Sequence, residues 1–63
     1  MSIYDVKITY LNEDTDIFVV EEEYLYDSFY INEATCLLIK DILGNVKLIS
    51  LKAISNIDYQ IRN

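Results

Sequence analysis

The stretch that decides the fold is residues 35–51, TCLLIKDILGNVKLISL, in which two apolar runs flank the pair Gly44–Asn45. Both residues of such a pair tolerate positive φ, so the pair predicts a hairpin closed by a two-residue loop. We therefore expect two antiparallel strands here, joined at Gly44 and Asn45.

Upstream of this stretch, residues 3–11 alternate apolar and polar side chains, which is the pattern of a half-buried strand. Residues 12–15, NEDT, supply turn-forming side chains, and residues 16–22 resume a β-branched and aromatic run. These segments predict a second hairpin, formed by residues 3–11 and 16–22. Its first strand should turn one apolar side to the core, made by Tyr4, Val6, Ile8 and Tyr10.

Downstream, Leu51, Ile54 and Ile57 lie three residues apart, which predicts one helical turn near residues 51–55. Residues 57–62 then alternate apolar and polar side chains. We expect the chain to end in another half-buried strand.

Residues 21–30, EEEYLYDSFY, allow two interpretations. A helix would leave no continuous apolar stripe. An extended chain would place Glu22, Tyr24 and Tyr26 on one side, with a turn at residues 27–28 before a further strand, FYIN. Aromatic residues and Ile favour strands, so we expect the extended conformation.

Together these segments predict a single all-β domain over residues 1–63. It is expected to be a small antiparallel meander of five or six strands, or a small barrel, with one short helical turn near residues 51–55. The order of elements resembles small barrels of the SH3-like or Sm-like type, in which a short turn precedes the last strand. That resemblance concerns the fold alone and implies no functional residues, because no residue motif accompanies it.

Two segments, CLLI and LISL, are apolar at consecutive positions, which in a sheet means apolar side chains on both faces. A sheet this small has only one interior, so some of these side chains should remain outside the monomer core. Exposed apolar patches usually mark interfaces. We therefore expect a homodimer or a higher homo-oligomer, with an interface that includes Leu37, Leu38, Ile39, Leu48 and Ile49.

Catalytic chemistry has little support in the residue types present. The chain has no His, the usual proton carrier near neutral pH, and no nucleophile has an evident base beside it. Cys36 is the only cysteine and lies in an apolar run, where a buried thiol is inert. We expect a non-enzymatic protein that has no catalytic residue and no cofactor.

A metal site is also not expected. Asn12, Asp14, Asp16 and Glu23 have the spacing of acidic positions in a calcium-binding loop. Such a loop needs Gly at its sixth position, where this chain has Ile17, and helices on both sides, where this chain predicts strands. These residues are better explained as a solvated turn.

Charge is divided unevenly along the chain, whose net charge is −6. Residues 1–34 hold nine acidic side chains and one basic side chain, a net of −8, whereas residues 35–63 hold two acidic and four basic, a net of +2. A negative field repels nucleic-acid phosphates and attracts basic proteins. We therefore expect a protein partner with a basic surface and no direct binding to nucleic acid.

Two functions follow from these patterns. In the first, carboxylates and tyrosines imitate a row of phosphates and mask the nucleic-acid-binding surface of a basic protein, as small acidic inhibitors from bacteriophages do. The binding residues would be Glu13, Asp14, Asp16, Glu21, Glu22, Glu23, Tyr24, Tyr26, Asp27 and Tyr30. In the alternative, the chain is a self-assembling structural or regulatory small-barrel subunit, and its acids only keep the assembly soluble.

Location follows from two absences in the sequence. No apolar run approaches the roughly 18 residues that a membrane span needs, and residues 1–10 lack the basic and apolar regions of a signal peptide. We expect a cytoplasmic protein without membrane contact.

Overall fold

The computed structural model describes residues 2–25, 28–31 and 34–62, with the backbone alone for 28–31. The fold is mainly β, as the sequence predicts. Its elements are strands β1 (Ile3–Tyr10) and β2 (Thr15–Glu21), the 3-10 turn η1 (Glu22–Tyr24), strands β3 (Ser28–Ile31), β4 (Ala34–Lys40) and β5 (Val46–Ser50), the 3-10 turn η2 (Leu51–Ala53), and strand β6 (Ile54–Ile61).

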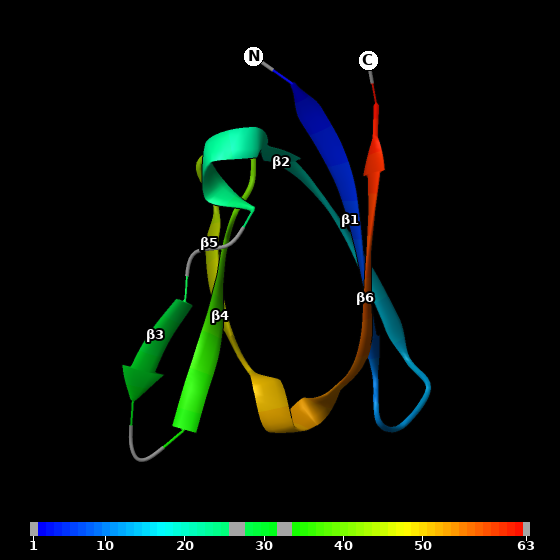
Figure 1. Ribbon diagram of the computed structural model, residues 1–63, viewed down its shortest axis with the longest axis vertical. Helices are drawn as coiled ribbons and strands as arrows, with labels where there is room; N and C mark the ends of the chain where they lie inside the picture. Colours follow the sequence, from blue (N-terminus) through cyan, green and yellow to red (C-terminus); the bar gives the residue numbers. More distant parts are fainter. Residues whose placement is uncertain (1, 26–27, 32–33, 63) are drawn as a thin grey trace.

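The strands form two antiparallel sheets, ordered β2-β1-β6 and β3-β4-β5. The sheets face each other, and the 3-10 turns carry the chain between them at opposite ends of the molecule (Figure 1). β6 returns to pair with β1, so the strand order departs from a simple meander. Among the described residues, the pairings make two separate sheets and no closed barrel.

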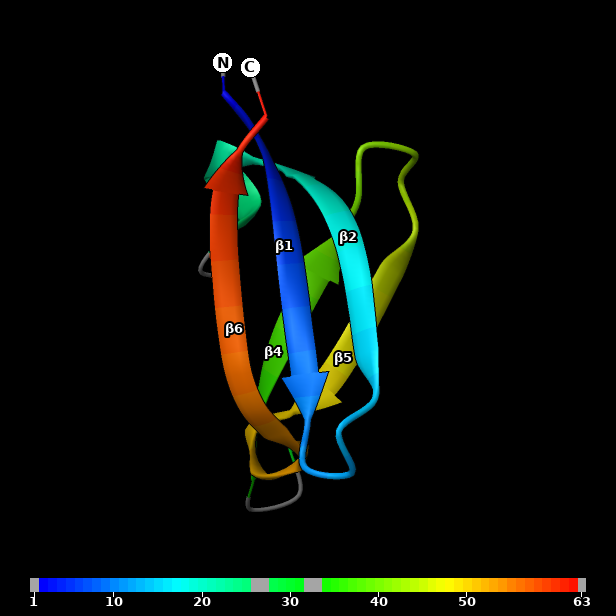
Figure 2. The ribbon, with the colours of Figure 1, turned by 90° about the vertical axis from the view of Figure 1, so that its right-hand side faces the viewer.

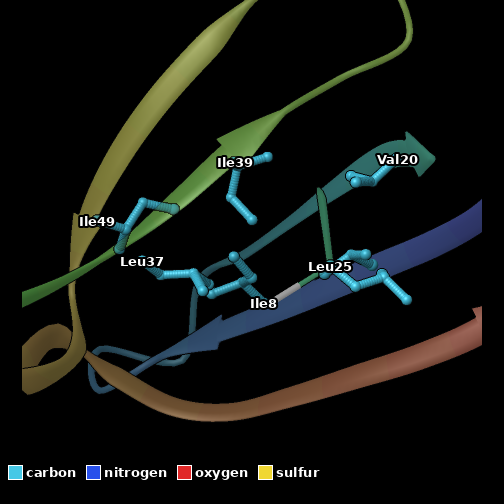
Figure 3. Close-up of a cluster of buried hydrophobic side chains, with 7 residues drawn as sticks. Ile8, Val20, Leu25, Leu37, Ile39 and Ile49 are labelled. Carbon is cyan, nitrogen blue, oxygen red and sulfur yellow. The ribbon is translucent and has the colours of Figure 1, made fainter. Parts of the chain in front are cut away.

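The core lies between the two sheets (Figure 3). Val6 and Ile8 on β1 are fully buried, as the alternation along residues 3–11 predicts, and Lys7 on the opposite face is exposed. These two side chains are completely buried because β1 is the central strand of its sheet and has a neighbouring strand on each side. The buried apolar residues of the described chain are Val6, Ile8, Val20, Leu25, Leu37, Ile39 and Ile49.

The first hairpin is confirmed, with Val6 opposite Phe18 and Tyr4 opposite Val20. Its loop is held by two backbone bonds. The Tyr10 amide donates to the Asp14 carbonyl (2.8 Å), and the Glu13 amide donates to the Tyr10 carbonyl (3.0 Å). Glu13 has a φ of 74°, a left-handed conformation that non-glycine residues rarely adopt.

The second hairpin is also confirmed, but the predicted two-residue length of its loop is wrong. The strands end at Lys40 and resume at Val46, which leaves a five-residue loop. The Gly44 amide donates to the Asp41 carbonyl and the Asp41 amide to the Asn45 carbonyl, both at 3.0 Å. Gly44 alone of the expected pair has positive φ, at 89°, which makes this a tight turn followed by a left-handed residue.

The Asp41 side chain explains why the longer loop is stable. One carboxylate oxygen accepts from the amides of Leu43 and Asn45, each at 2.9 Å, and the other accepts from the Asn45 side chain at 3.1 Å. These hydrogen bonds, that of the Asn45 side chain first, lower the pKa of Asp41. Asn45 therefore serves as a partner for Asp41 and does not supply a left-handed backbone.

The extended conformation expected for residues 22–24 is wrong, because Glu22–Tyr24 form the 3-10 turn η1. The Glu22 amide donates to the Ser2 carbonyl, and the turn then brings the Leu25 side chain into the core between the sheets. The strand propensity of these residues does not decide their conformation, because the chain leaves one sheet here and crosses to the other. The further strand is confirmed as β3, whereas the turn expected at residues 27–28 falls partly outside the described residues.

Near the C-terminus, the predicted helical turn is confirmed as η2. The last strand, however, begins at Ile54 and not at Ile57. Pairing with β1 explains the earlier start, because Tyr10 is opposite Ile54 across a local irregularity in the register. Residues 54–56, which the sequence does not assign to the last strand, thus belong to it because they pair with β1.

Candidate interaction surface

β2 is an edge strand, and its free side faces the loop between β4 and β5 (Figure 2). The Ile42 amide in that loop donates to the Val19 carbonyl at 3.0 Å. Because successive residues of a strand direct their backbone groups to opposite edges, Ile17 also directs its amide and carbonyl away from β1. At this edge, Val19 is therefore hydrogen-bonded to the loop of the second hairpin, whereas the backbone groups of Ile17 are available to a partner.

A groove runs beside this edge, with a volume of about 240 Å³. Its apolar wall is well exposed, since Ile17 is 66% exposed and Leu43 is 82% exposed. The lining residues are Ile17, Phe18, Val19, Asp41, Ile42 and Leu43. Sequence reasoning did not identify this groove, because its two walls come from different hairpins.

Exposed acidic side chains lie at both ends of β2. Glu13 and Asp14 lie in the loop before the strand, and Glu22 and Glu23 lie in η1 after it. Seven residues of strand separate these ends by about 20–25 Å at ~3.3 Å per residue. The predicted acidic surface is therefore divided into two clusters with an apolar groove between them, and Glu21, at the end of β2, is only half-buried.

Asp16 does not belong to either cluster, although the sequence places it among the binding acids. Its Oδ2 accepts from the Tyr10 hydroxyl at 2.6 Å and lies 3.5 Å from Lys47 Nζ on β5. The hydrogen bond from Tyr10, followed by the charge of Lys47, lowers the pKa of Asp16. Desolvation and the Asp16 carboxylate raise the pKa of Tyr10 to about 12. These three side chains tie the two sheets together, so Asp16 has an internal role.

Of the tyrosines in the expected binding row, the structure describes the side chain of Tyr24 alone. Tyr24 is half-buried and packs against the core, and Lys40 Nζ lies 4.8 Å from the centre of its ring. That contact is a cation–π interaction within the protein. Tyr26, Asp27 and the side chain of Tyr30 lie outside the described residues.

The expected self-association residues divide into two groups. Leu37, Ile39 and Ile49 are buried in the core of the monomer, so these three are corrected from interface to core residues. They alternate with Leu38, which is half-buried, and Leu48, which is 46% exposed, on the opposite face of the sheet. Of these five residues, Leu38 and Leu48 remain available for contact with another chain.

The outer face of the first sheet forms a second, wider hollow of about 530 Å³. Arg62 Nε lies 3.5 Å from Asp5 Oδ1 across it, and both side chains are partly exposed. Its lining residues are Asp5, Lys7, Ile17, Asp58, Gln60 and Arg62. Opposite charges are interspersed here, so this hollow does not select one sign of ligand.

Cys36 is a free, half-buried cysteine on β4. No group of three or more His, Cys, Asp or Glu side chains that could hold a metal ion occurs in the described part of the chain. In the same residues, no helix has the length and apolar character needed to cross a membrane.

Comparison with protein-family models, curated proteins and solved structures gives no match to this chain.

Proposed function

We propose that this protein is a non-enzymatic acidic interaction domain that binds a basic surface of another protein along β2. The observation that carries the proposal is the placement of exposed acids, Glu13 and Asp14 at one end of β2 and Glu22 and Glu23 at the other, with an apolar groove between them. An extended partner segment with Lys or Arg at both ends and apolar side chains in the middle fits this pattern.

Edge strands bind such segments by adding a strand to the sheet, where backbone hydrogen bonds supply affinity and side-chain pockets supply specificity. Ile17 would face the apolar middle of the segment. The acidic ends would speed the encounter and fix the direction of the partner, as complementary charge does at protein interfaces.

Masking is the proposed consequence of this binding. Lys and Arg side chains held by the acids at the two ends of β2 are no longer available to nucleic-acid phosphates, so the protein would act as an inhibitor of the phage type. A cytoplasmic location is part of this proposal, because its partner is a nucleic-acid-binding protein.

A second candidate function is a self-assembling subunit. It is favoured by Leu48, an apolar side chain exposed on an edge strand of the second sheet. We also propose that the two sheets are an open form of a small SH3-like or Sm-like barrel. Two features support that relation, the pairing of β6 with β1 and the position of η2 directly before β6.

The masking proposal is tested by affinity capture from cell lysate, identification of the captured protein, and titration of that protein in purified form. Its binding should weaken as salt rises from about 0.1 M toward 1 M, where the Debye length falls to ~3 Å. A variant with Glu13→Gln, Asp14→Asn, Glu22→Gln and Glu23→Gln should bind at least about tenfold more weakly, a loss of roughly 1.4 kcal/mol.

Asp58→Asn is the matched control, because Asp58 is an exposed acid on β6, away from the β2 edge. Binding by this variant should equal that of the parent. If the fourfold variant binds the purified partner as tightly as the parent does, the acidic ends of β2 are not the binding surface.

A further inference from the structure

β5 is an outer strand of the second sheet, and its free edge can be mapped residue by residue. The Asp41 amide bonds to the Asn45 carbonyl, which makes these two residues a hydrogen-bonded pair of the hairpin. Hydrogen-bonded and non-bonded pairs alternate in an antiparallel ladder. Lys47 and Ile49 therefore bond to β4, and Val46 and Leu48 direct their amides and carbonyls outward.

Apolar side chains accompany these outward backbone groups. Val46 is 59% exposed and Leu48 is 46% exposed, and the half-buried Leu38 lies directly opposite Leu48 on β4. In the described part of the chain, no backbone hydrogen bond reaches the outward groups of Val46 or Leu48. An edge strand with free backbone groups and apolar side chains is a template for pairing with another strand.

We propose that β5 pairs antiparallel with β5 of a second copy of this chain, around a two-fold axis that passes beside Leu48. The result is one continuous six-stranded sheet that spans two molecules. Leu48 faces Leu48 of the second copy, Val46 faces Ser50, and Lys47 faces Ile49. Each copy contributes the same edge, as a closed two-fold interface requires.

Charge favours a second copy on this edge. The pairing brings no like charges directly opposite each other, and each Lys47 already has Asp16 at 3.5 Å in its own molecule. Like charges that are directly opposite would destabilise a sheet. The acid clusters at the ends of β2 belong to the other sheet.

The β2 edge lacks this compatibility with itself. A two-fold pairing around Ile17 would place Glu13 of each copy opposite Glu21 of the other, which gives two pairs of like charges. β5 is therefore better suited than β2 to pairing with a second copy, which leaves β2 for a basic partner.

The pairing is expected to be weak. Five residues of strand on each side cover less than the roughly 1,200 Å² at which stable interfaces begin, so the dimer should form in a concentration-dependent manner. This inference does not rest on the masking function, because the two surfaces use different edge strands.

Sedimentation equilibrium of the full chain between about 10 µM and 1 mM tests the proposal. The parent should shift from monomer to dimer within this range. Leu48→Lys should raise the dimer dissociation constant at least tenfold, because a lysine on a free edge opposes pairing. Ile17→Lys adds the same charge to an exposed apolar residue on the edge strand β2 and should leave the constant unchanged.

A single cysteine tests the two-fold axis itself, in a Cys36→Ser background. Directly opposite residues in a hydrogen-bonded pair have Cα atoms about 5.5 Å apart, within disulfide range. Leu48→Cys should therefore give a covalent dimer in a glutathione redox buffer. Val46→Cys is the control on the same edge, since the two copies of residue 46 would lie about 13 Å apart at ~3.3 Å per residue.

Each outcome decides the proposal. A concentration-dependent dimer that Leu48→Lys weakens, with disulfide formation at residue 48 and not at 46, supports it. A parent that stays monomeric up to 1 mM overturns it, as does equal cross-linking at both positions. Circular dichroism of each variant verifies that the exposed substitutions leave the fold unchanged.

Discussion

The loops of the β1–β2 hairpin and the β4–β5 hairpin have the same pattern of two backbone hydrogen bonds but different residues at the equivalent positions. In each loop, the fourth residue of the turn has positive φ, Glu13 at 74° in the first and Gly44 at 89° in the second. Glycine adopts this conformation without steric cost, whereas glutamate does not. The comparison shows that one turn geometry can arise with or without the residue that identifies it in a sequence.

The strands of the two hairpins differ in a second way. Along β1, buried Val6 and Ile8 alternate with polar residues, so the strand has one apolar face. Along β4 and β5, Leu37 and Ile49 face the core while Leu38 and Leu48 face outward. β1 therefore uses its apolar face within the monomer, whereas β4 and β5 also carry apolar side chains on their outer face, which is free for a partner.

The largest expected effect concerns the buried faces of the two hairpins. Ile8→Ala and Ile49→Ala should each lower the free energy of unfolding by about 2–5 kcal/mol, with Ile8 toward the upper end because its strand has neighbours on both sides. Urea denaturation monitored by circular dichroism measures these losses.

Leu43→Ala is the control, since Leu43 is exposed in the loop of the second hairpin. It should change stability by less than about 0.5 kcal/mol. A larger loss for Ile49→Ala than for Ile8→Ala would show that the second hairpin is the better packed of the two.

The next effect separates the two loops. Gly44→Ala should lower the free energy of unfolding by about 1–2 kcal/mol, because alanine would have to adopt a left-handed backbone conformation. The space around the new Cβ is open, so no steric clash adds to this loss. Glu13→Gly should stabilise by up to about 1 kcal/mol, reduced by the greater freedom of glycine in the unfolded chain. If Gly44→Ala lowers the midpoint of thermal unfolding and Glu13→Gly raises it, the two loops share one geometry. Changes of the same sign in the two variants would contradict this.

The smallest effect concerns the hydrogen bond from the Tyr10 hydroxyl to Asp16, within the first hairpin. The folded chain raises the pKa of Tyr10 to about 12, from an ordinary value near 10. Between these values the unfolded chain loses the Tyr10 proton first, so stability is fully present below about pH 10 and falls as pH rises toward 12. Tyr10→Phe should show a smaller decrease in thermal midpoint over this range, although both proteins share the effect of the other tyrosines.

Asp16→Asn provides the matching test on the other side of this contact. Without the carboxylate, part of the raised pKa of Tyr10 is lost. The alkaline decrease in stability should therefore still begin near pH 10, but it should be smaller and should end at lower pH. Absorbance near 295 nm follows the tyrosine ionisation directly. An unchanged titration in Asp16→Asn would exclude this hydrogen bond as a cause of the raised pKa.

Local patterns predicted the strands well and the candidate surface incompletely. Alternation identified β1 because one buried face repeats every second residue, and Gly44 marked the second hairpin. Nothing in the sequence signalled that Asp16 would be held by Tyr10 and Lys47, since Lys47 lies 31 positions further along the chain. The groove beside Ile17 was hidden for the same reason, because its opposite wall is the loop of another hairpin.

The sequence by itself determined the mainly β fold, the two hairpins, the 3-10 turn before the last strand, and the uneven division of charge. These properties depend on neighbouring residues and on composition. Only the tertiary structure decided that η1 replaces extended chain at residues 22–24, that the exposed acids lie at opposite ends of β2, and which leucines remain outside the core. Those outcomes depend on how two sheets meet and how the chain crosses between them, and no local pattern records such contacts.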